Sequence, residues 1–192
     1  MAEEAIQNDM DTEEVELDQY VVFAVKSQEF AFQAIRVREI VSVLEPTQVP
    51  NAPPYVDGIV NLRGQLATVI NFRNKFGFEA KEHDEDTRTI VVEQDDFPIG
   101  ILVDSVEEVI KIPDTEVQKL PESTSTSVSE EYITGVGLME NRLIILLNVD
   151  KVLTKSELVE IEEVRQAIND AQDLKTEEET EMNQKEDVEP GI

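Results

Sequence analysis

The chain contains two copies of one sequence pattern, and this repeat constrains its fold more than any other feature. Each copy has an aromatic residue and a glycine, then a short break, then an apolar run that ends at asparagine. In both copies the glycine and the asparagine are 13 positions apart, at Gly58 and Asn71 and at Gly135 and Asn148. Two copies of this length predict two copies of a small β unit, because a solenoid needs three or more short repeats.

Short runs of β-branched and aromatic residues, separated by turn residues, predict about ten strands. Five strands per copy, each set closed on itself, would leave few exposed edges, so we predict an all-β fold of two small barrels. We place the double barrel at residues 19–154, with the first copy at about 26–78 and the second at about 88–154. The first strand is expected to pair with the second barrel, which would interlock the two.

The segments outside this body differ in composition. Residues 1–18 hold 8 acidic and no basic side chains, and residues 175–192 are also acidic, so we predict that both are disordered. Residues 155–174 have a helical period, which predicts a C-terminal amphipathic helix. Its apolar stripe consists of Leu158, Ile161, Val164, Ile168, Ala171 and Leu174. We expect the stripe to cover the β body, and partner binding is the alternative.

The chain carries a net charge of −27 and contains no cysteine. Nucleic acids and anionic membranes are bound through clustered lysine and arginine, so we expect no nucleic-acid partner. No apolar run approaches the ~20 residues of a membrane helix, and the N-terminus lacks a basic region followed by an apolar stretch. We therefore expect a cytoplasmic protein without direct membrane insertion, monomeric on its own.

The sequence lacks a recognisable catalytic set. The only histidine, His83, lies in an acidic stretch at residues 83–86 that has neither the ligand spacing nor the turn glycine of a calcium loop. No cysteine nucleophile, glycine-rich phosphate loop or apolar carboxylate pair is present. We expect a protein that is not an enzyme and has no cofactor, and a metal-dependent enzyme is the unfavoured alternative.

The two copies differ most at one turn. Residues 61–64 read Asn-Leu-Arg-Gly, whereas residues 138–141 read Leu-Met-Glu-Asn. A hairpin turn explains Gly64, and it equally explains Asn141 at the matching place, but it does not explain Arg63. Arginine suits a bidentate contact with a carboxylate, so Arg63 is either an interface anchor or a simple turn residue.

The motif at residues 54–64, Pro-Tyr-Val-Asp-Gly-Ile-Val-Asn-Leu-Arg-Gly, strongly resembles the signature of CheW-type chemotaxis coupling proteins. Residues 100–106 are similar to the second hallmark of that family. Residues 132–136 and 143–153 resemble its closing hairpin and its short terminal helix. The resemblance covers residues 19–153.

The resemblance implies two interlocked five-stranded SH3-like barrels and an adaptor role. Such proteins link the cytoplasmic tips of chemoreceptors, the methyl-accepting chemotaxis proteins, to the regulatory domain of the histidine kinase CheA in membrane-associated receptor arrays. A CheW-like coupler of another kinase pathway, such as one that controls surface motility, is the alternative.

By the same resemblance, the partner-binding residues are expected to be Val37, Glu39, Gly58, Asn61, Leu62, Arg63 and Gly64. Glu39 is matched by Glu108 in the second copy, so a solvated strand edge is the other interpretation of this position. Two residues depart from the family pattern: Thr68 stands where proline is usual, and Asn71 where aspartate is frequent.

Overall fold

The structure is a computed structural model, and it describes residues 17–94, 97–119, 132–139, 141–163 and 165–166. The rest of the predicted acidic end segments, together with residues 164 and 167–174 of the predicted helix, lie outside the described residues. Leu17 and Asp18 correct the predicted boundary of the N-terminal segment. Both belong to the first strand, because they pair with Pro113 and Ile112 of a later strand.

Among these residues the strands form two sheets. The six-stranded sheet has the order β8 (Ser105–Pro113), β1 (Leu17–Val25), β2 (Gln28–Gln33), β11 (Arg142–Leu147), β10 (Ile133–Met139) and β9 (Val117–Gln118). The five-stranded sheet has the order β3 (Val37–Ser42), β6 (Arg88–Gln94), β7 (Phe97–Val103), β5 (Gln65–Asn71) and β4 (Val56–Leu62).

Helical structure is sparse in the described part of the chain. The short helices are η1 (Ala34–Arg36), α1 (Phe72–Lys75), η2 (Asp114–Glu116) and α2 (Val149–Val152). Residues 155–163 and 165–166 are also helical. None of the described helices combines the length and the apolar character needed to cross a membrane.

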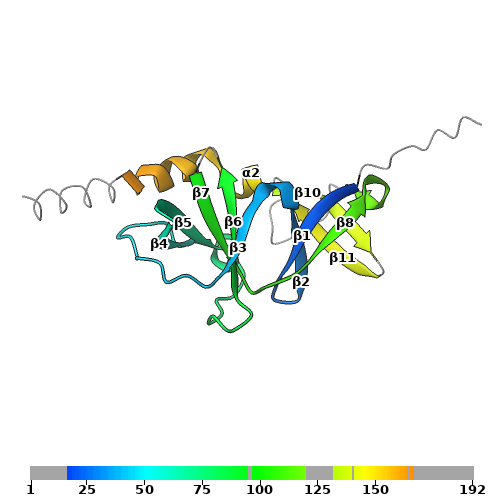
Figure 1. The fold of residues 1–192 in the computed structure, drawn as a ribbon, viewed down its shortest axis with the longest axis horizontal. Coiled ribbons are helices and arrows are strands. Elements are labelled where there is room, and N and C mark those ends of the chain that lie inside the picture. Colours follow the sequence, from blue (N-terminus) through cyan, green and yellow to red (C-terminus); the bar gives the residue numbers. More distant parts are fainter. Residues whose placement is uncertain (1–16, 95–96, 120–131, 140, 164, 167–192) are drawn as a thin grey trace, which may run out of the picture.

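The two sheets exchange strands. β1 precedes the first copy of the repeat and β2 belongs to it, but β1 pairs with β8 and β2 pairs with β11. In return, β6 and β7 join the first copy through the pairs β3–β6 and β5–β7. Figure 1 shows the two sheets side by side, and the chain crosses between them from β2 to β3 and from β7 to β8. The sequence predicted an exchange of the first strand alone. In the structure three further strands, β2, β6 and β7, also lie in the sheet of the other copy.

An aromatic core joins the sheets. Phe23 on β1 and Phe30 on β2 meet Phe72, which follows β5, with ring centroids 5.4 and 5.1 Å apart. All three side chains are fully buried. Since the rings come from both sheets, the sheets cannot separate without exposing large apolar surfaces to water.

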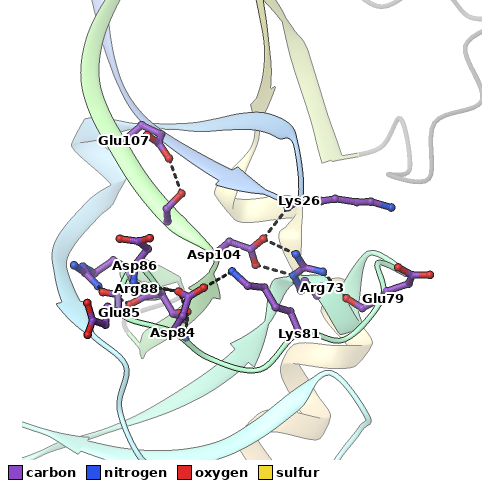
Figure 2. A network of polar contacts seen from close by, with 12 residues as sticks. Lys26, Arg73, Glu79, Lys81, Asp84, Glu85, Asp86, Arg88, Asp104 and Glu107 are labelled. Carbon is purple, nitrogen blue, oxygen red and sulfur yellow. Dashed lines mark hydrogen bonds and ion pairs between the residues drawn. The ribbon is translucent and has the colours of Figure 1, made fainter.

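Asp104 holds the crossing from β7 to β8 in place (Figure 2). Its carboxylate accepts hydrogen bonds from Arg73 Nε at 2.7 Å, from Arg73 Nη2 at 2.5 Å and from the backbone N–H of Lys26 at 2.7 Å. Lys26 lies in the β1–β2 turn and Arg73 lies in α1, so one carboxylate connects three segments. The side chains of Asp104 and Arg73 are largely buried. Burial acts to raise the pKa of Asp104, but the hydrogen bonds from Arg73 and Lys26 outweigh it and lower this pKa below its ordinary value.

Replacing Asp104 with asparagine should lower the free energy of unfolding by about 2–3 kcal/mol, because Arg73 would lose its buried charged partner. Urea denaturation measures the change. Glu107→Gln is the matched control. Glu107 is exposed and accepts a hydrogen bond from Ser105, so this change should stay within about 0.5 kcal/mol.

The loss of unfolding free energy in Asp104→Asn should also depend on pH. A carboxyl group whose pKa is lowered in the folded protein contributes stability above its ordinary pKa of 3.8, and this contribution disappears as the pH falls through the folded value. The gap between the wild type and Asp104→Asn should be full at neutral pH and should shrink on acidification below pH 3.8. A gap that is independent of pH would show that the carboxylate charge is not what stabilises the crossing.

Candidate functional site

The β4–β5 hairpin carries five of the predicted site residues. Leu62 pairs with Gln65, so Arg63 and Gly64 form a two-residue loop. Both loop residues have a positive φ, 52° for Arg63 and 88° for Gly64, as type I′ hairpin turns require. Asn61 Oδ1 accepts a hydrogen bond from the N–H of Gly64 at 2.7 Å. Asn61 and Gly64 therefore shape the turn, and Arg63 is the residue that the turn presents.

Arg63 reaches from the turn to Glu39 on β3. Its Nη2 lies 2.8 Å from Glu39 Oε2, and beside this pair Arg38 Nη1 donates to Gln65 Oε1 at 3.0 Å. The two contacts join the hairpin to β3, although β3 and β4 stand at opposite ends of the sheet order. The Arg63 side chain is 82% exposed and that of Glu39 is 19% exposed. The structure thus brings together two residues that the sequence analysis named separately.

Val37 and Leu62 are half-buried and support this surface from inside. Val37 opens β3, pairs in register with Val92 and packs against the main apolar core. Leu62 packs against a smaller apolar cluster around Val60. The sequence analysis did not single out Ile40, which is 40% exposed on β3 immediately after Glu39.

Gly58 is required by a close approach of backbone. A Cβ atom at this position would lie 2.3 Å from the backbone oxygen of Thr47, and the φ of Gly58 is +144°. Next to it, Ile59 and Thr47 exchange two backbone hydrogen bonds of 3.0 and 2.9 Å. Gly58 therefore lets the loop that precedes β4 pair with that strand.

The second half of the chain places a different arginine against the matching glutamate. Arg142 donates to Glu29 through Nε and Nη2, at 3.1 and 2.7 Å, and to Glu108 through Nη1 at 2.6 Å. Arg142 comes two positions later in the repeat than Arg63, whose own counterpart, Glu140, lies outside the described residues. The sequence analysis missed Arg142. The signal that could have found it is the pair of matching glutamates, since each needs a basic partner on the facing hairpin.

The departure from the family pattern at Asn71 has a local reason. Its side-chain amide donates to Asp57 Oδ2 at 3.2 Å, and its Oδ1 accepts from the N–H of Asn74 at 3.2 Å to cap α1. Burial raises the pKa of Asp57, and the hydrogen bond from Asn71 and the nearby His83 act in the opposite direction. An aspartate at position 71 could not donate to Asp57.

The acidic stretch around His83 is organised by its own hydrogen bonds. Asp84 Oδ1 accepts from the backbone N–H groups of Asp86 and Thr87, both at 3.1 Å, and Oδ2 pairs with Lys81 Nζ at 2.6 Å (Figure 2). Within the part of the chain that the structure describes, no three histidine, cysteine, aspartate or glutamate side chains form a group that could hold a metal ion.

Comparisons with known proteins identify the family of the chain. A model of the CheW-like domain matches residues 19–157. The chain is 35% identical to the chemotaxis protein CheW of Helicobacter pylori over 140 residues, which cover 73% of this chain and 84% of that protein. It is 33% identical to the chemotaxis protein CheW of Bacillus subtilis over 140 residues, which cover 72% and 88%. Its fold is similar to the crystal structure of the scaffolding protein TtCheW from Thermoanaerobacter tengcongensis, with a TM-score of 0.67 and 24% identity over 81% of this chain and 96% of that chain.

Gly58 and Gly64 offer a matched pair of substitutions to alanine. At Gly64 a Cβ atom would meet nothing within 4 Å, so only the positive φ should cost stability, by about 1–2 kcal/mol. At Gly58 the contact with the Thr47 backbone adds to that cost, so Gly58→Ala should be clearly the more destabilising of the two. Thermal melts of both variants test this. Equal losses of stability would mean that the Thr47–Ile59 pairing can shift to make room for the Cβ atom at no cost in stability.

Proposed function

Since the chain belongs to the CheW-like domain family, we propose that it is a non-enzymatic adaptor of chemotaxis. The proposed partners are the regulatory domain of the histidine kinase CheA and the cytoplasmic tips of chemoreceptors. The proposed location is the cytoplasm, with recruitment to membrane-associated receptor arrays. Support comes from the family match over residues 19–157 and from relatives that carry the name of a chemotaxis protein.

The exposed guanidinium of Arg63 is the observation that supports a partner site most directly. A tight turn with two positive φ angles presents this side chain, and 82% of it is open to solvent. Its pairing with Glu39 lies at the surface, and surface ion pairs of this kind contribute little net stability, so the arginine can exchange Glu39 for a partner carboxylate at low cost. Arg142 is held by two glutamates and is only 41% exposed. The first hairpin is therefore the better suited of the two to bind a partner.

The surroundings of Arg63 fit an interface as well. Arginine is one of the residues that are enriched in binding hot spots, and Glu39 on β3 lies in contact with it. In this proposal Arg63 and Glu39 contact the partner. Val37, Gly58, Asn61, Leu62 and Gly64 hold the surface in shape from behind.

We also propose that each sheet closes into an SH3-like barrel. In the five-stranded sheet, the Arg63–Glu39 pair joins the β4–β5 turn to β3, at the other end of the sheet order, and the Thr47–Ile59 bridge joins the loop after β3 to β4. In the six-stranded sheet, the Arg142–Glu108 pair reaches from β11 to β8.

A coupling assay tests the proposed function. The chain should raise the autophosphorylation rate of CheA when receptor signalling fragments are present, and it should have no effect on the isolated catalytic domain of the kinase. The measurement is phosphate incorporation with and without the chain. Equal kinase activity in both conditions, with receptor present, would show that the chain is not a coupler of this kinase.

The role of Arg63 can be separated from its pairing with Glu39 by a charge swap. Arg63→Glu should lower the folding stability by only about 1 kcal/mol, the cost of a carboxylate that faces Glu39 at the surface. It should weaken binding to CheA or to the receptor fragment by roughly 2 kcal/mol, the size of a hot-spot loss. The double variant with Glu39→Arg restores an ion pair within the protein but not the positive charge at position 63. If Arg63 contacts a partner, the double variant stays weak in calorimetric titrations.

Lys151→Glu is the control for charge, because Lys151 is exposed on α2 and the substitution changes the net charge equally. It should bind as the wild type does. Full recovery of binding in the double variant would assign Arg63 to closure of the barrel alone.

A further inference from the structure

Lys75 lies where the two halves of the chain meet. It is the last residue of α1, its side chain is only 6% exposed, and its Nζ pairs with Glu157 Oε1. The same Nζ lies 4.6 Å from the ring centroid of Tyr55 and 5.8 Å from that of Tyr132, within the range of cation–π attraction. Tyr55 and Tyr132 occupy equivalent positions in the two copies of the repeat. We call these four residues the Lys75 junction.

Glu157 uses its two carboxylate oxygens for different partners. Oε2 accepts hydrogen bonds from the N–H of Thr154 at 2.8 Å and from its hydroxyl at 2.9 Å, and Thr154 Oγ1 accepts from the N–H of Glu157 at 3.4 Å. This reciprocal arrangement is a capping box, and it starts the helical residues 155–163 and 165–166, which we call the capped helix. Oε1 pairs with Lys75. One side chain therefore both caps the helix and attaches it to the Lys75 junction.

The charge state of Glu157 suits this double role. Burial acts to raise its pKa, but the hydrogen bonds from Lys75 and Thr154 outweigh burial and hold the pKa below its ordinary value. Burial also raises the pKa of Tyr55, and the negative charges of Glu157 and Glu160 raise it further. At neutral pH the junction thus contains an ionised Glu157 carboxylate that pairs with Lys75, beside a neutral Tyr55.

The apolar anchors of the capped helix are few among its described residues. Ile161 is buried at 6% exposure and Leu158 is partly buried, whereas Val159 is 58% exposed. A helix of this length is marginal in water without docking. A buried ion pair adds little stability compared with apolar side chains of the same volume. It can, however, fix one relative position of the two segments that carry the charges. The residues matched by the family model end at Glu157, so most of the capped helix lies beyond them.

We propose that Glu157 is a positioning residue that couples docking of the capped helix to the order of the Lys75 junction. The helix and the junction then open together as one unit, at a lower free energy than the β body. If the helix were held only by its local cap, substitution of Lys75 would not change its free energy of opening, because Lys75 is not part of the cap. This inference does not depend on the partners proposed above.

Hydrogen exchange on the full chain tests the coupling. The readout is the exchange rate of the Leu158 amide, which donates to Thr154 O at 3.0 Å, relative to that of Ile101 in the buried strand β7. Lys75→Met should speed up Leu158 exchange by about tenfold or more relative to Ile101, although the substituted residue is not on the helix. Glu157→Gln should have a similar effect. Lys151→Met is the control, because this lysine is exposed on α2, and it should leave the ratio unchanged.

The double variant decides between coupled and independent roles. If Lys75 and Glu157 act as one unit, the two fold-changes do not multiply, and the double variant exchanges no faster than the more affected single variant. Three results would overturn the proposal. They are an unchanged Leu158 rate in Lys75→Met, fold-changes that multiply in the double variant, and equal acceleration of Leu158 and Ile101, since the helix would then open only with the whole protein.

Discussion

The exchange of strands between the two sheets is the constraint on which the rest of the structure depends. The parallel pairs β2–β11 and β5–β7 each join strands from different copies of the repeat, so neither copy can complete its sheet alone. Phe23, Phe30 and Phe72 fill the space that this exchange creates, and Asp104 binds Arg73 and the backbone of Lys26 where β7 passes into β8. Apolar burial supplies the driving force, while the Asp104 contacts select one geometry for the crossing.

On this common frame the two hairpins have diverged. Arg63 lies in the turn itself and meets one glutamate, whereas Arg142 lies at the start of the next strand and meets two. Arg63 meets a glutamate on β3 and Arg142 meets one on β8, and neither of these strands is a neighbour of the respective hairpin in the sheet order. The first arginine is 82% exposed and the second 41% exposed. Under the proposed function, the first hairpin therefore carries the binding surface, while both copies keep the same architecture.

Two polar side chains at the edge of the buried core each bind more than one partner. Glu157 is shared between a helix cap and the lysine that lies beside Tyr55 and Tyr132, and Asn71 is shared between a helix cap and Asp57. Each satisfies more than one buried or half-buried group, which avoids the cost of leaving a donor or acceptor unpaired. These shared side chains connect local helix starts to contacts between the halves.

The sequence by itself determined that the chain is built from two copies of a small β unit, that a tight hairpin presents Arg63, and which family the chain belongs to. Those conclusions rest on local spacing, turn chemistry and motif, which neighbouring residues encode. Only the tertiary structure decided that β2, β6 and β7 also lie in the sheet of the other copy, that Arg63 meets Glu39, and that Gly58 must lack a side chain because Thr47 approaches it. Such contacts join residues far apart in the chain. Strand periodicity says which face of a strand is buried, but it does not say which strand lies next to it.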